Sequence, residues 1–179
     1  FESSIFTVEK GKSVAEPVTI SYAPQEKSYT CADQVIVAEE NSESTFIVDY
    51  SGCKEGHFGL STKIIVKENA KVTFVTVNLL EKDAVHYDAI GTDVAENARL
   101  EVVQIELGAD RTYTGTYNLL GGRKSDCKGY VGYAAKDEQR DIEARIEELE
   151  NLLKNVEVVV EDEADTDVVS IGSIVGIRD

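Results

Sequence analysis

Residues 66–79 read VKENAKVTFVTVNL, and this phrase joins two runs rich in β-branched residues through the turn Glu-Asn-Ala. Related phrases are VAEENSESTFIVDY at residues 37–50 and VAENARLEVVQIEL at residues 94–107. The anchoring asparagines recur at a spacing of 28 residues: Asn41, Asn69 and Asn97. A fixed period of this length indicates a repeat protein, in which each unit packs on the next.

Each repeat has the same predicted anatomy of a short strand, a corner and a second strand. In the central repeat the strands are residues 63–67, KIIVK, and residues 71–78, KVTFVTVN. Asparagine suits the corner because it tolerates the left-handed backbone conformation and can hydrogen-bond within its own turn. The second strand alternates with a period near two, and its buried face is predicted to hold Val72, Phe74 and Val75, opposite Lys71 and Thr73.

The repeat also predicts the fold class. One unit of two short strands cannot bury its apolar side chains alone, whereas stacked units can, with backbone hydrogen bonds running from coil to coil. The chain is therefore predicted to be mainly β, with a β-solenoid of ~28-residue repeats over residues 1–133 and weaker copies around Ser13 and Ser125. A β-sandwich is the alternative, but it does not account for the regular period.

Composition limits the classes of function. Of the 179 residues 42% are hydrophobic, which is enough for a core, and the formal net charge is −16. Direct nucleic-acid binding is not expected, because it needs clustered Lys and Arg. No run of 18 apolar residues predicts a membrane span, and three separated cysteines without a CxxC pair favour a reducing cytoplasm. The chain starts at Phe1 and contains no Met, so we interpret it as a fragment.

Few residues are candidates for ligand chemistry. His57 and His86 are the only histidines, and a solenoid could bring both to Cys53 as metal or cluster ligands. The favoured interpretation is a surface loop for His57 and a half-buried position for His86. The three cysteines, Cys31, Cys53 and Cys127, are expected to be small buried hydrophobes.

Other patterns predict no catalytic site. The glycine pair at residues 121–122 is interpreted as a turn, because no helix is expected after it to complete a phosphate loop. Two acidic pairs, Asp88 with Asp93 and Glu39 with Glu40, are expected on a solvated face. The chain is therefore not expected to be an enzyme, and no catalytic, cofactor-binding or metal-binding residue is assigned.

Residues 61–126 read STKIIVKENAKVTFVTVNLLEKDAVHYDAIGTDVAENARLEVVQIELGADRTYTGTYNLLGGRKSD and resemble the core of the SufB/SufD family. The resemblance rests on the strand–ENA–strand phrases, the strand between them that contains His86, and the LLGG at residues 119–122; it extends over roughly residues 5–133. It implies a scaffold protein of iron–sulfur cluster assembly that works with the ATPase SufC. The family's C-terminal region, which holds the ATPase contact and the Cys and His residues implicated in cluster building, is not found. No residue of that region is carried over.

From about residue 134 the pattern changes to that of a helix. Apolar residues recur at heptad spacing, which is typical of a coiled coil, and a helix is predicted over residues 134–154. The predicted protein interface is the seam of this helix: Ile142, Ile146, Leu149, Leu153 and Val156. Two short strands are expected after it, at residues 156–160 and 168–177. An alternative is that the helix packs on the last coil of the solenoid.

Residues 134–179 contain the phrases AAKDEQ, IEARIEELE and VSIGS, which resemble GreA, the transcript-cleavage factor of bacterial RNA polymerase. The resemblance covers some 46 residues and implies the end of a coiled-coil helix and the start of a C-terminal domain. Residues 129–132, Gly-Tyr-Val-Gly, stand where an acidic tip turn is expected, so transcript cleavage is not expected. We interpret the change at residues 130–134 as a seam between two incomplete families, in a natural fusion or in a composite, chimeric sequence.

Three hypotheses of function follow. The first is a non-enzymatic scaffold of iron–sulfur cluster assembly, with a SufC-type ATPase or a SufB/SufD-type protein as partner. No resident cofactor is expected, and a cluster is expected only transiently. The second is a GreA-like fragment that binds RNA polymerase. The third is a self-associating fragment, such as a homodimer through the seam, without activity.

Overall fold

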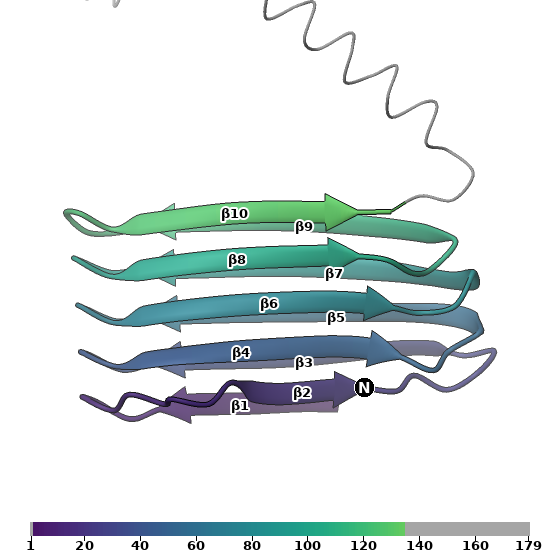
Figure 1. Ribbon diagram of the computed structural model, residues 1–179, viewed down its shortest axis with the longest axis horizontal. Coiled ribbons are helices and arrows are strands. Elements are labelled where there is room, and N and C mark those ends of the chain that lie inside the picture. Colours follow the sequence, from purple (N-terminus) through teal and green to yellow (C-terminus); the bar gives the residue numbers. More distant parts are fainter. Residues whose placement is uncertain (1, 135–179) are drawn as a thin grey trace, which may run out of the picture. The chain divides into compact units, whose positions relative to one another are not determined.

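The computed structural model describes residues 2–134, and the regular structure in this range consists of strands (Figure 1). Ten strands follow one another along the chain: β1 Glu2–Val8, β2 Val18–Tyr22, β3 Tyr29–Ala38, β4 Glu43–Ser51, β5 Glu55–Val66, β6 Lys71–Leu79, β7 Asp83–Val94, β8 Arg99–Glu106, β9 Arg111–Leu120 and β10 Asp126–Tyr133. No helix in these residues has the length and apolar character that crossing a membrane requires. The predicted coiled-coil helix and the two strands after it lie outside the described residues.

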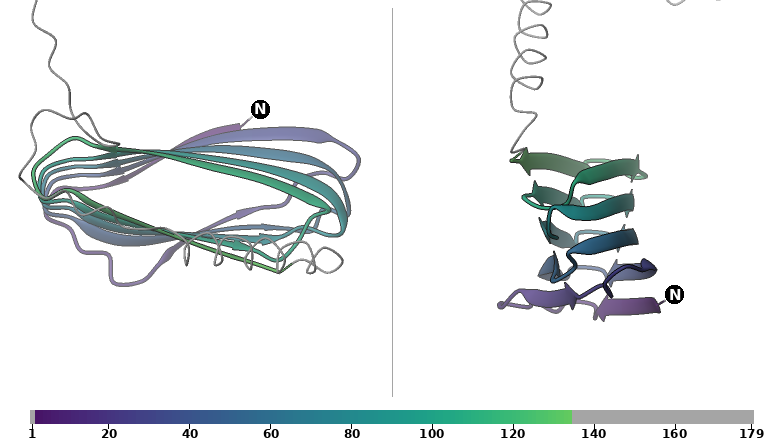
Figure 2. Two further views of the ribbon diagram at one scale, coloured as in Figure 1. Left: turned by 90° about the horizontal axis from the view of Figure 1, so that it is seen from above. Right: turned by 90° about the vertical axis from the view of Figure 1, so that its right-hand side faces the viewer.

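The strands alternate between two sheets. Odd-numbered strands form the sheet β1-β3-β5-β7-β9, and even-numbered strands form the sheet β10-β8-β6-β4-β2. All strand pairings are parallel. Each odd-numbered strand and the even-numbered strand after it therefore form one coil, and the coils stack on one another (Figure 2). This arrangement confirms the predicted β-solenoid. It excludes the β-sandwich, because the sheets of a sandwich are antiparallel.

The sequence period equals the structural period in the middle of the solenoid. Residues of β3, β5 and β7, and of β4, β6 and β8, pair with partners 28 positions along the chain. The offset is 30 between β1 and β3, 26 between β7 and β9, and 27 between β8 and β10. Loops of different length therefore absorb the irregular spacing at both ends, while the strands stay in register.

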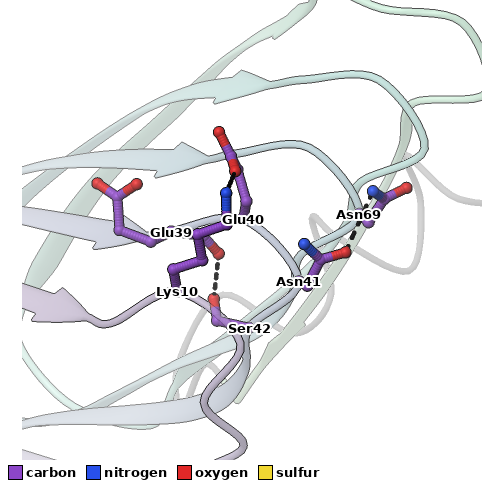
Figure 3. A network of polar contacts seen from close by, with 6 residues as sticks. All are labelled: Lys10, Glu39, Glu40, Asn41, Ser42 and Asn69. Atoms are coloured by element: carbon purple, nitrogen blue, oxygen red, sulfur yellow. Dashed lines mark hydrogen bonds and ion pairs between the residues drawn. The ribbon is translucent and has the colours of Figure 1, made fainter.

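One corner of every coil passes through the left-handed backbone region. The residues there, with φ between 55° and 70°, are Gly11, Asn41, Asn69, Asn97 and Lys124. The backbone N–H groups of the first four donate to carbonyl oxygens of the next coil at 2.9–3.1 Å. Asn69 Nδ2 also donates to Asn41 Oδ1 at 3.2 Å (Figure 3). The predicted left-handed conformation of asparagine is confirmed, and the Asn69 side chain bonds to the neighbouring coil rather than within its own turn.

Side chains close the corner as well. Ser42 Oγ donates to the carbonyl oxygen of Glu39 at 2.6 Å, and Lys10 pairs with Glu40 of the coil above (Figure 3). At the last corner Ser125 makes the same contact, at 2.8 Å, with the carbonyl three residues before it. The copy of the repeat predicted around Ser125 is thus a true coil of the structure.

Alternation along the strands sends every second side chain into the interior. One interior row contains Phe46, Phe74 and Val102 from β4, β6 and β8, all buried. Val75 lies on the partly exposed outer face and Thr76 is buried instead, so the prediction that Val75 is buried was wrong. A strand cannot turn two consecutive side chains inward without a bulge, and hydrophobicity does not override this geometry.

The strand before the Glu-Asn-Ala turn is longer than predicted. This strand, β5, spans twelve residues and begins at Glu55 rather than at residue 63. Gly56 and Gly59 weaken the strand propensity of its first half. Parallel pairing with β3 on one side and β7 on the other overrides that local preference.

Candidate functional site: a polar cluster inside the solenoid

Two interior rows become polar where β7 begins, while the row beside them changes in the opposite direction, from Gln34 and Thr62 to Ile90. Between β5 and β7 the equivalent inward positions change from Phe58 to His86 and from Leu60 to Asp88. In the facing sheet one interior row becomes progressively more polar from β4 to β8: Tyr50, Asn78 and Glu106. The titratable side chains of these rows therefore lie close together in neighbouring coils. We use the term polar cluster for Tyr50, His86, Asp88 and Glu106, together with Gln104.

Asp88 is the central acid of this cluster and is 2% exposed. Its Oδ2 accepts hydrogen bonds from the Tyr50 hydroxyl at 3.3 Å and from Gln104 Nε2 at 3.5 Å, whereas Oδ1 has no partner among the described residues. Burial, followed by the negative charge of Glu106, raises the pKa of Asp88 to about 7 against the smaller effect of the two donors. The carboxyl group is thus divided between its protonated and ionised forms at neutral pH.

His86 lies beside Asp88 on the same strand and is fully buried. Its Nδ1 is 3.2 Å from the carbonyl oxygen of Phe58, so Nδ1 carries the proton and donates, while Nε2 has no partner among the described residues. The ring lies 4.5 Å from that of Tyr50 and 5.6 Å from that of Phe58. Burial lowers the pKa of His86 to about 4, against the opposing effect of the Phe58 carbonyl. His86 is therefore neutral at pH 7.

Asn78 connects the cluster to the last coil. Its Nδ2 donates to Glu106 Oε2 at 2.8 Å and to Thr112 Oγ1 of β9 at 3.3 Å, while its Oδ1 accepts from the Leu80 N–H at 3.0 Å. Burial raises the pKa of Glu106, and the hydrogen bond from Asn78 opposes that rise. Burial and the charge of Asp88 also raise the pKa of Tyr50, which keeps the phenol protonated as a donor.

The cluster is suited to holding a proton rather than a metal. It combines a carboxyl group near half-protonation, a neutral imidazole and a phenol inside the solenoid, and none of them is ion-paired with a Lys or Arg of residues 2–134. Each buried polar atom without a partner costs about 1–3 kcal/mol, so the cluster lowers the stability of the fold. Within residues 2–134 no group of three or more His, Cys, Asp or Glu side chains is placed to hold a metal ion.

The ligand candidates from the sequence are not brought together. His57 points outward from β5 and His86 points inward from β7. His57 lies in a strand, half-buried, and His86 is fully buried, so the predicted loop and half-buried positions were wrong. Pairing with β3 and β7 puts these positions in regular strands. Cys53 is buried as predicted, whereas Cys127 is half-buried and Cys31 is exposed on the outer face, contrary to the prediction.

One of the four acidic residues, Asp88, also differs from the prediction. Asp88 is buried and not on a solvated face, because β7 keeps the alternation of β5 and its position falls on that of Leu60. The period of 28 residues could have predicted this burial, because it makes Asp88 equivalent to Leu60 and Glu106 equivalent to Asn78 and Tyr50. The glycine pair at residues 121–122 lies in the connection between β9 and β10, just before a turn at residues 123–124, and a strand rather than a helix follows it, in line with the prediction. The predicted seam, Ile142, Ile146, Leu149, Leu153 and Val156, lies outside the described residues.

Comparison with protein families gives one match over most of the chain. The model of the SUF system FeS cluster assembly, SufBD core domain family matches residues 21–149. These residues include the strands β3 to β10 and therefore the whole polar cluster. No solved structure matches the chain.

Curated proteins match a shorter stretch. The chain is 72% identical over 46 residues to transcription elongation factor GreA of Lachnoclostridium phytofermentans, 54% over 46 residues to that of Clostridium kluyveri and 56% over 45 residues to that of Clostridium botulinum. These matches cover 25–26% of this chain and 28–29% of the relatives, so the chain spans less than a third of their length. They support a partial GreA-like segment.

Proposed function

The chain belongs to the SufBD core domain family of the SUF system of iron–sulfur cluster assembly, and we propose that it acts in that system as a non-enzymatic scaffold. The family match over residues 21–149 carries the proposal. The stacked parallel sheets support it, because a solenoid offers extended, rigid faces suited to holding other proteins.

The partners that we infer are a SufC-type ATPase and a SufB/SufD-type protein. An iron–sulfur cluster would be cargo, held only transiently, and its ligands would come partly from a partner. The placement of the thiols supports this view, because Cys31 lies on the outer face of β3, Cys53 is buried before β5 and Cys127 is on β10.

The test is affinity capture from a bacterial lysate under anaerobic conditions, with the tagged full chain as bait and mass spectrometry as readout. We expect recovery of the SufC-type ATPase, and uptake of iron and sulfide when the recovered complex is reconstituted. A matched bait carries Ile146→Asp and Leu149→Asp, which put charge into the predicted seam. It should recover the ATPase equally well if the solenoid makes the contact. Absence of the ATPase with both baits would contradict the proposal.

A second candidate function is supported by the 72% identity to GreA over 46 residues. In this reading the chain is a fragment that contacts RNA polymerase through its GreA-like segment. The same capture experiment distinguishes it, since polymerase subunits would be recovered with the unaltered chain and lost with the double variant. Recovery of polymerase without the ATPase would reverse the order of the two candidates.

A further inference from the structure

Aromatic rings from four strands stack on the outer face of the sheet formed by the odd-numbered strands. Ring centroids are 4.5 Å apart for Tyr29 and His57, 6.2 Å for His57 and Tyr87, and 5.1 Å for Tyr87 and Tyr113. The first and last pairs are in register, but His57 is paired with Val85. The aromatic ladder therefore steps by two residues between β5 and β7.

This step leaves a groove beside the tyrosines. The residue paired with Tyr87 in β5 is Gly59, which has no side chain, so one face of the Tyr87 ring has no neighbour in its own row. A groove of about 520 Å³ lies here, with Gly59, Ala89 and Gly115 among the lining residues and Tyr87 and Tyr113 as its aromatic part. Its volume is within the range of small-ligand sites, roughly 300–1,000 Å³.

The charge of the groove favours a cation. Asp33 is the carboxylate on its outer-face lining, and the lining contains no Lys or Arg. Arg111 is near in sequence to Tyr113, but it forms an ion pair with Asp110 at 3.4 Å. The faces of aromatic rings are negative, and the chain as a whole carries a net charge of −16.

We propose that this groove binds the guanidinium group of an arginine in a basic peptide segment of a partner protein. The planar group would lie over Gly59, against the part of the Tyr87 ring that the offset His57 ring leaves uncovered, and donate hydrogen bonds to Asp33. Arginine fits better than lysine, because its flat, weakly hydrated cation stacks on aromatic rings while keeping its donors free. The charge of Asp33 selects it over a neutral planar group of the same shape.

The probe is a capped Gly-Arg-Gly peptide, added to the full chain at pH 7.5 and low salt. Binding is followed by NMR through the backbone amide signals of Gly59 and Ala89. We expect saturable shifts with a dissociation constant in the millimolar range. The matched peptide with citrulline keeps the shape and loses the charge, and we expect it to bind at least ~5-fold more weakly. Equal binding of the citrulline peptide, or no shift with the arginine peptide, would overturn the proposal.

Two variants with matched controls locate the site. Asp33→Asn removes the charge, and Gly59→Leu fills the space beside Tyr87; both should weaken binding at least ~3-fold. A Cβ at Gly59 meets only Cys31 Sγ, at 3.5 Å, so the fold should persist, which circular dichroism checks. The controls are Asp93→Asn and Gly91→Ala, on the same face but outside the groove, where a Cβ at Gly91 meets nothing within 4 Å. Equal losses in the controls would also overturn the proposal.

Discussion

Leu60 and Asp88 occupy the same position in successive coils, are paired in register, and are each 2% exposed. Their backbone positions are equivalent, but burial has opposite effects on stability for the two side chains. Burial of leucine contributes about 1.5–3 kcal/mol to stability, whereas burial of the carboxylate raises the pKa of Asp88 to about 7 and leaves Oδ1 without a partner. The position of a residue in the coil thus determines whether its side chain points inward, but it does not determine whether that side chain is polar.

The same contrast continues toward the last coil. The inward positions of β9, in register with those of β7, are Thr112, Thr114, Thr116 and Asn118, followed by the apolar Leu120. Thr92 Oγ1 donates to Asn118 Oδ1 at 2.8 Å, and Thr116 Oγ1 donates to Gln104 Oε1 at 3.3 Å. Hydrogen bonds between interior side chains therefore hold the polar cluster and its neighbours, whereas apolar packing runs through early and late coils alike, and Gln34 also donates to Thr62 in the earlier coils. The polar cluster and the apolar rows should respond differently to truncation and to pH.

The largest expected effect comes from Phe74→Ala in the apolar region. Phe74 is fully buried in the row with Phe46 and Val102, and its loss should lower the free energy of unfolding by about 3–5 kcal/mol. Urea denaturation followed by circular dichroism measures this change. Val131→Ala in β10, where the side chain is 57% exposed, is the control and should cost less than about 1 kcal/mol. Equal costs would mean that burial in the interior of the solenoid does not determine the packing energy of a side chain.

Asp88→Asn tests the polar region through pH. The folded-state pKa of about 7 lies above the ordinary 3.8, so the stabilising contribution of the protonated form is complete below pH 4 and is lost as the pH rises through 7. Asparagine keeps an acceptor for Tyr50 and Gln104 and cannot ionise. The variant should match the wild type near pH 4 and exceed it by about 2–4 kcal/mol at pH 8. A constant difference between pH 4 and 8 would contradict the assignment.

His86→Phe should show the opposite pH dependence. The folded-state pKa of about 4 lies below the ordinary 6.5, so stability is complete above pH 6.5 and falls as the pH drops toward 4. Phenylalanine keeps the ring contacts with Tyr50 and Phe58 and cannot be protonated. We expect the variant to lose about 2–3 kcal/mol less than the wild type between pH 7 and pH 4, by urea denaturation.

Combining Asp88→Asn and His86→Phe in one chain gives a further test of both assignments. As the pH falls from 7 to 4, protonation of Asp88 stabilises the wild type and protonation of His86 destabilises it, so the two effects nearly cancel. The double variant should therefore have almost the same shallow pH profile as the wild type over this interval, while each single variant shows a steep one. Steep profiles in the double variant would point to Glu106 as the dominant titrating group.

The architecture could be predicted from the sequence, because equivalent positions of successive repeats adopt the same backbone geometry. Asn41, Asn69 and Asn97 marked the corners, and the period of 28 predicted the register of the middle coils. The polar cluster was not predicted, because the local sequence suggests a solvated position for Asp88 and only a half-buried one for His86. Only the strict parallel pairing with β5 turns them inward, which is a long-range constraint.

The smallest effect concerns the corners, where the middle coils have asparagine and the last has lysine. Lys124 adopts φ 57°, a conformation that lysine does not favour, while Asn69 adopts φ 59° and donates to Asn41. Glycine relieves the left-handed strain but increases the entropy of the unfolded chain, so Lys124→Gly should stabilise by at most about 0.5–1 kcal/mol. Asn69→Gly loses its hydrogen bond and should be neutral or slightly destabilising. Urea denaturation of both variants measures the difference, and a larger gain at Asn69 than at Lys124 would mean that the asparagine corners are under more strain than the lysine corner.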